Sequence, residues 1–170
     1  MAKKIPELVS SSLMKYQEAI SHTLRALYAK NGYIPFKMSR FEEYDLYAEN
    51  KDFLMGESVI TFNDTDGRLL ALKPDVTLSI IRNTSFEPGC KQRLCYNENV
   101  YRISPSTHRY KEIMQSGVEC IGDLDILDIY EVLLLSAESL SAVSDDFVID
   151  ISHMGLVSAV IDSLDRKSVV

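Results

Sequence analysis

The chain has 170 residues, about the length of one ordinary domain, and 46% of them are hydrophobic, which excludes a chain too polar to form a core. Asp and Glu number 25 against 18 Lys and Arg, so the net charge of −7 would repel a polyphosphate backbone over most of the surface. Any contact with nucleic acid would therefore need a local basic patch.

The cysteines and histidines predict neither a disulfide framework nor a metal site. Cys90, Cys95 and Cys120 are odd in number and lack C-x-x-C spacing, and the three histidines are scattered along the chain. The start of the chain has two lysines but no apolar signal segment, and no apolar run is long enough to cross a membrane. We therefore expect a cytoplasmic protein without a membrane anchor.

The first part of the chain predicts helices and one hairpin. Apolar residues between Pro6 and Lys30 recur at steps of three and four, which is typical of an amphipathic helix ending near Gly32. A short acidic helix is expected around residues 40–49. Residues 58–62 and 68–72 predict two strands joined by the turn-forming cluster NDTDG.

The remainder predicts a second, larger hairpin between helices. The run KPDVT predicts a helix to about Asn83, with Pro74 in its first turn and Asp75 at its positive end. Two long strands at 93–102 and 110–122 follow a loop, and then a strongly apolar helix begins at Asp125. A buried strand at 147–151 and a last helix from about Met154 complete the pattern. Antiparallel hairpins with helices of intermediate length indicate an α+β domain.

Several polar residues stand on these otherwise apolar elements and are candidates for binding a ligand. Gln115 and Glu119 are four apart on a strand and so share one face, which Gly117 would leave open to a ligand. An amide beside a carboxylate suits an ammonium group or a protonated imidazole. Arg102 and Arg109 flank the hairpin loop, where they could hold one anion from two sides.

Each of these residues also has a simpler interpretation. Asp75 and Thr77 could serve only to satisfy free backbone N–H groups at a helix start. Gln115 and Glu119 could lie on a solvated face, or Glu119 could pair with a nearby arginine. Arg102 and Arg109 could both be solvated surface arginines.

The order of two long segments adds a resemblance. ALKPDVTLSIIRN resembles the histidine–tRNA ligase segment L-R-P-E-G-T…R, and RLCYNENVYRISPSTHRYKEIMQSGVECIG resembles the second motif of class II synthetases with its return strand. The resemblance implies that Asp75 and Thr77 hold the amino group of histidine and that Gln115 and Glu119 line its pocket. It places Arg102 on the arginine that binds the α-phosphate and carboxylate, and Arg109 on the loop arginine.

Departures from the ligase pattern are equally informative. Ser104 replaces the glutamate that helps to hold adenine, and Asp75 replaces a glutamate. The R/K-P-D-x-T variant and the stretch VIDISHMGLVSAVIDSL, which contains His153, are similar to regulatory subunits of ATP phosphoribosyltransferase. In the first class II motif, Ser39 stands at the proline position.

The resemblance implies a class II synthetase-like antiparallel sheet flanked by helices. It spans a single core domain over residues 1–170 that is truncated before the third motif. The leading hypothesis is a non-catalytic regulatory subunit that binds histidine and a catalytic ATP phosphoribosyltransferase subunit, forms a homodimer and needs no cofactor. The alternative is part of a histidine–tRNA ligase, in which Arg102 and Arg109 would bind ATP with magnesium and tRNA would be the partner. A dimerisation scaffold without a ligand is a third interpretation.

Overall fold

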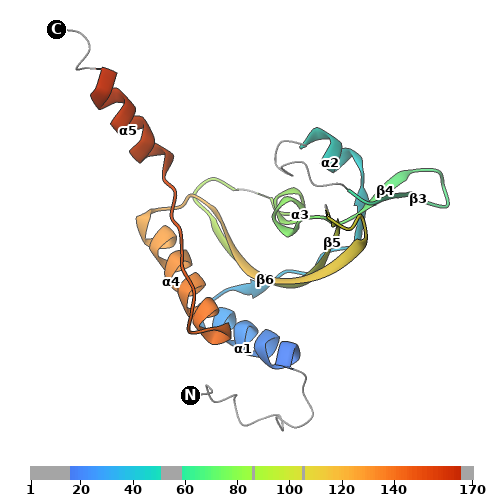
Figure 1. Ribbon diagram of the computed structural model, residues 1–170, viewed down its shortest axis with the longest axis horizontal. Coiled ribbons are helices and arrows are strands. Elements are labelled where there is room, and N and C mark those ends of the chain that lie inside the picture. The colour runs from blue at the N-terminus through green and yellow to red at the C-terminus, as the bar shows by residue number, and fades with distance from the viewer. Residues whose placement is uncertain (1–15, 51–58, 86, 105, 166–170) are drawn as a thin grey trace.

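The computed structural model describes residues 16–50, 59–85, 87–104 and 106–165 (Figure 1). Two small sheets and five helices make up this part of the chain. In chain order they are α1 (Tyr16–Lys30), β1 (Ile34–Pro35), β2 (Phe41–Glu43), α2 (Asp45–Glu49), β3 (Thr61–Asn63), β4 (Leu69–Leu72), α3 (Val76–Asn83), β5 (Lys91–Ile103), β6 (Tyr110–Gly122), α4 (Ile126–Val143) and α5 (Met154–Asp165). The predicted α+β class is confirmed.

The long hairpin β5–β6 is the centre of the fold. Its antiparallel pairing runs without interruption from Lys91 opposite Gly122 to Ile103 opposite Tyr110. Because paired residues point to the same side, each face of the hairpin is defined by alternate residues of both strands. β1 adds a short parallel pairing to β5, which the sequence did not indicate, and β2, β4 and β3 form the second sheet in that order.

Helices cover the two faces of the hairpin differently. On one face α1 and α4 pack through Leu24, Tyr28 and Leu135 against Cys95. On the opposite face α3 contributes a core of its own, made of Val76, Ile80, Leu94 and Val100. Figure 1 shows α1 and α4 together on one side of β5 and β6, with α3 and the second sheet on the other. The hairpin thus presents one face to α1 and α4 and the other to α3.

Local sequence explains where the helices begin and end. α1 ends before Gly32, whose φ of 80° lies in the left-handed region that glycine accepts without a Cβ clash. α3 begins after Asp75, and Pro74 precedes the helix instead of standing in its first turn. At α4, Asp125 and Asp128 form a capping box, in which each side chain accepts a hydrogen bond from the other residue's backbone N–H.

A group of charged side chains fastens the start of α4 to β5, and we call it the α4 clamp. Lys91 Nζ lies 2.8 Å from Asp125 Oδ2 and also pairs with Asp128, whose side chain is only 3% exposed. Arg93 Nε lies 2.9 Å from Glu131 Oε1 and its Nη2 lies 3.2 Å from Asp128 Oδ1. Since both cations come from β5 and the three acids come from α4 and its N-cap, the α4 clamp sets how α4 lies on the hairpin.

Two predicted elements are wrong in part. Residues 41–43 form strand β2 instead of helix, because they pair with Leu70–Leu72 of β4, and the acidic helix begins only at Asp45. The predicted strand at 147–151 is irregular, with Val148 and Ile151 81% and 68% exposed. Its apolar pattern suits a strand, but no described strand lies beside it to supply the backbone hydrogen bonds.

No helix in the described ranges is both long and apolar enough to span a bilayer.

Candidate functional site

The start of α3 brings the first two predicted site residues to the hairpin. Asp75 is the N-cap in an extended conformation, and its Oδ1 accepts a hydrogen bond of 3.0 Å from the backbone N–H of Leu78. The cap satisfies one of the free donors at the helix start and fixes Thr77 in the first turn. Asp75 therefore does satisfy a backbone N–H group at the helix start, as its simpler interpretation predicted. This bond uses Oδ1 and leaves Oδ2 for other contacts.

Thr77 meets Glu119 across the space between α3 and β6. Thr77 Oγ1 donates a hydrogen bond of 2.6 Å to Glu119 Oε1, although the two residues are 42 positions apart. Burial raises the pKa of Glu119, the Thr77 hydroxyl opposes this rise, and the negative charge of Asp75 adds to it. Asp75, Thr77 and Glu119 thus form one site, in which two carboxyl groups lie close enough to influence each other.

Arg102 anchors the segment that leads into this site. Its Nε donates a hydrogen bond of 3.0 Å to the carbonyl oxygen of Pro74, and the neighbouring Tyr101 N–H donates one of 2.8 Å to the carbonyl of Lys73. These two bonds hold the residues just before Asp75 against β5. Arg102 is therefore held next to the site through its contact with the backbone, and its predicted contact with a ligand stays a prediction.

Gln115 and Glu119 do share a face, but the space above Gly117 is filled. A Cβ at position 117 would lie 2.5 Å from the Tyr96 hydroxyl oxygen and 2.7 Å from its Cζ. The expectation that Gly117 leaves the strand open to a ligand is wrong, because Tyr96, its direct partner on β5, lies over it. Burial, followed by the charges of Glu119 and Asp75, raises the pKa of Tyr96 to about 12. Tyr96 therefore forms a neutral wall of the site.

Sequence reasoning also missed an ion pair beside Gln115. Glu98 is the direct partner of Gln115 on β5, and its Oε2 lies 3.1 Å from Lys73 Nζ. The Lys73 side chain is completely buried, so its charge is neutralised inside the protein by Glu98. The available signal was the strand register, which places Tyr96 and Glu98 on the same face as Gln115 and Glu119.

Arg109 remains apart from the site in this structure. It lies exposed at the end of the hairpin, where its backbone carbonyl accepts a hydrogen bond of 2.9 Å from Ser104 N–H. Its side chain forms no hydrogen bond or ion pair within the described part of the chain, whereas the Arg102 side chain is bonded to the Pro74 carbonyl. The placement of the two arginines does not support the prediction that they bind one anion from two sides.

The chemistry of the site favours a cationic ligand head. Two carboxyl groups and a hydroxyl group meet between α3 and β6, and half-buried Gln115 lies on the same face of the hairpin, so an ammonium or imidazolium group would find acceptors there. Across residues 16–165, wherever the structure describes them, no group of three or more His, Cys, Asp and Glu side chains is arranged to hold a metal ion. The assignment of Asp75, Thr77, Arg102, Gln115 and Glu119 to histidine stays a prediction.

Comparisons with known proteins agree with the resemblance in the sequence. The family model described as Histidyl-tRNA synthetase matches residues 8–169. An ATP phosphoribosyltransferase regulatory subunit of Clostridium kluyveri is 33% identical over 94% of this chain and 43% of its own length. A histidine–tRNA ligase of Methanocaldococcus jannaschii is 30% identical over 89% of this chain and 38% of its own length. The chain thus spans well under half the length of the curated relatives it matches.

Solved structures support the same fold. An ATP phosphoribosyltransferase regulatory subunit/histidyl-tRNA synthetase from Bacillus halodurans matches 84% of this chain and 38% of its own with a TM-score of 0.59 at 24% identity. A chain of the ATP phosphoribosyl transferase (HisG:HisZ) complex from Thermotoga maritima matches 76% of this chain and 42% of its own with a TM-score of 0.57 at 22% identity. With a family model covering nearly all of its residues, this chain belongs to the histidyl-tRNA synthetase-like family, which has the class II aminoacyl-tRNA synthetase fold.

Proposed function

We propose that this chain is the histidine-binding part of an ATP phosphoribosyltransferase regulatory subunit, which relays histidine binding to a catalytic subunit. The single observation that carries the proposal is the 2.6 Å hydrogen bond from Thr77 to Glu119 beside the Asp75 carboxylate. It joins in space three residues that the family resemblance assigns to histidine. The amino group and imidazole of histidine would occupy the acidic end, and Arg102 would face its carboxylate.

The position at which ligases hold the adenine of ATP supports a regulatory function over a ligase function. Ser104, at the place of the ligase glutamate, is 5% exposed and has no carboxylate to hold adenine. It closes a tight turn, with its N–H donating to the Arg109 carbonyl and its carbonyl accepting from the His108 N–H. The regulatory function requires no cofactor, whereas the ligase alternative requires ATP and magnesium at this turn.

Several of the similar proteins are regulatory subunits, which supports the regulatory function, and another is a ligase, which keeps the ligase alternative. Regulatory subunits from Clostridium kluyveri, Thermoanaerobacter pseudethanolicus and Alkaliphilus metalliredigens are 29% to 33% identical to this chain. The ligase of Methanocaldococcus jannaschii, at 30%, keeps histidine activation as the second candidate. We propose a homodimer and a catalytic phosphoribosyltransferase subunit as partners, and tRNA only in the ligase alternative.

Calorimetric titration with histidine tests the shared binding step. Saturable binding is expected, and Glu119→Gln should weaken it by about ten-fold or more because it removes the charge that faces the ligand cation. Glu138→Gln on α4, an exposed glutamate, is the matched control and should bind as the unchanged protein does. Equal affinities of the two variants would refute the proposed site.

A second experiment separates the two functions. Co-purification with a catalytic phosphoribosyltransferase subunit and stimulation of its activity are expected of the regulatory subunit. Histidine-dependent exchange between ATP and pyrophosphate would instead establish the ligase and contradict the regulatory proposal.

A further inference from the structure

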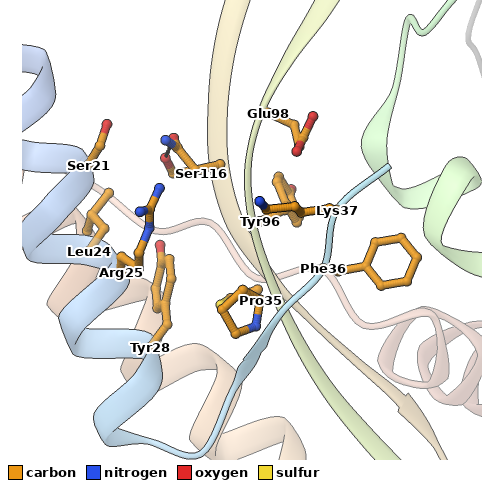
Figure 2. A pocket seen from close by; sticks show the side chains of 12 residues that line it. Ser21, Leu24, Arg25, Tyr28, Pro35, Phe36, Lys37, Tyr96, Glu98 and Ser116 are labelled. Carbon is orange, nitrogen blue, oxygen red and sulfur yellow. Dashed lines mark hydrogen bonds between the residues drawn. The ribbon is translucent and has the colours of Figure 1, made fainter. Parts of the chain in front are cut away.

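A cavity of about 350 Å³ lies between α1, the segment after β1 and β5 (Figure 2). Its volume is at the lower end of the range of about 300–1,000 Å³ for small-molecule sites. It lies where the short pairing of β1 with β5 ends, since β1 pairs with β5 only at Leu94 and Cys95 and the last backbone bond runs from Phe36 N–H to the Cys95 carbonyl. Asp75, Thr77 and Glu119 do not line it, whereas Tyr96 borders both this cavity and the proposed histidine site.

Two cationic side chains from different elements enter this cavity. Figure 2 shows Arg25 extending from α1 and Lys37 from the segment after β1 into the same space in front of β5. Neither forms an ion pair or side-chain hydrogen bond with any residue the structure describes, although the chain has an excess of acids. The charge of Arg25 also lowers the pKa of the Cys95 thiol on the cavity wall, against the larger effect of burial, which raises it. The positive potential therefore reaches into the cavity.

The remaining wall suits the body of a small organic molecule. Leu24 is apolar, and Tyr28 and Tyr96 add aromatic rings, whereas the Phe36 ring points away toward the α3 core (Figure 2). Asn97 accepts a hydrogen bond of 2.6 Å from Ser116 through its Oδ1, which leaves its amide N–H groups as donors.

One acidic residue, Glu98, also lines the cavity, and its charge is already compensated. The Lys73 ammonium, 3.1 Å away and completely buried, balances the Glu98 carboxylate from the protein side. The two remaining cations thus give the cavity a net positive charge, which favours an anion.

We propose that this cavity binds a small organic anion, whose carboxylate or phosphate group lies between Arg25 and Lys37 and whose flat or apolar body rests on Leu24 and the tyrosine rings. Carboxylate and phosphate share the chemistry that two cationic side chains recognise. The proposal does not rest on the proposed histidine function, because its two cations, Arg25 and Lys37, are not residues of the histidine site, although the Tyr96 ring borders both.

Calorimetry with benzoate, phenyl phosphate and the neutral benzamide tests the proposal on the unliganded protein. Saturable binding of benzoate or phenyl phosphate is expected, with benzamide bound about ten-fold or more weakly because it lacks the charge. Whichever of benzoate and phenyl phosphate binds with the higher affinity shows whether the cavity prefers a carboxylate or a phosphate group. Inorganic phosphate shows how much of the affinity comes from charge without the apolar body.

Substitutions locate the binding. Arg25→Gln and Lys37→Gln should each weaken the tighter anion by about ten-fold. Lys30→Gln is the matched control, since it removes the same charge from the exposed end of α1 outside the cavity and should leave the affinity unchanged. All three residues are exposed, so circular dichroism should show unchanged folding. Absence of saturable binding, equal affinity for benzamide, or wild-type affinity in both cavity variants would overturn the proposal.

Discussion

Gly117→Ala would add one methyl group at the most crowded point of the hairpin. The new Cβ would lie 2.5 Å from Tyr96 Oη and 2.7 Å from its Cζ, far inside the separation of about 3.5 Å at which carbon atoms attract. The φ of Gly117 lies outside the left-handed region, so the substitution strains packing alone. Tyr96 would have to leave its place against the α3 core. Overpacking of this kind costs about 1–3 kcal/mol.

Urea denaturation measures this cost as a lower free energy of unfolding. For a chain of this size, a loss of about 2 kcal/mol corresponds to a thermal midpoint lower by roughly 4–8 °C. Tyr96→Leu removes the phenol atoms that the methyl group would meet. In that background the same alanine should cost less than about 0.5 kcal/mol, and the difference is the coupling energy of the pair. An equal cost in both backgrounds, or no cost in the first, would refute the packing argument.

Three further substitutions address single contacts. Thr77→Val should raise the pKa of Glu119 further in a carbon-13 NMR titration, because the valine cannot donate the hydrogen bond that opposes the effect of burial. Tyr47→Phe removes one of two hydroxyl groups that donate to Glu42 and should lower the free energy of unfolding by about 1–2 kcal/mol in urea. In the α4 clamp the lysine ammonium, together with backbone N–H groups, lowers the pKa of Asp125 from 3.8 to about 2. Its stabilising effect should therefore be complete above pH 3.8 and disappear as the pH falls through about 2, and Asp125→Asn should reduce this acid dependence of the thermal midpoint.

Each of these variants has a control of the same chemistry at a site without the contact. The controls, in the same order, are Thr61→Val, Tyr44→Phe and Asp145→Asn. An unchanged Glu119 pKa, a Tyr47→Phe protein as stable as its control, or an acid dependence that survives Asp125→Asn would contradict the corresponding contact.

Local patterns in the sequence were sufficient for the end of α1, the starts of α3 and α4 and the long hairpin. Asp75 and Asp125 are short acids that can accept from free backbone N–H groups, and both are N-caps. α1 ends before Gly32 because glycine, which lacks a Cβ, adopts the left-handed conformation that closes a helix. These features depend on neighbours within a few positions, which the sequence displays directly.

Features that depend on distant partners could not be predicted in the same way. The strand at Phe41–Glu43 exists because β4 lies beside it, while residues 147–151 have the composition of a strand without a described neighbour. Tyr96 covers Gly117 only in the observed register, and Glu98 meets Lys73 only once the second sheet has folded against β5. For the candidate site, sequence and resemblance identified Asp75, Thr77 and Glu119, and the structure added their contacts and the tyrosine wall.

The unbroken pairing of β5 with β6 limits how this part of the chain can change. Gln115 and Glu119 face the candidate site, while Val118 and Cys120 alternate with them on the other face of the hairpin. A single residue inserted into or deleted from either strand would exchange these faces and bury carboxylates beneath α1 and α4. Changes of length can therefore be accommodated only outside the paired strands, between Ile103 and Tyr110, whereas the strands can vary only by substitution.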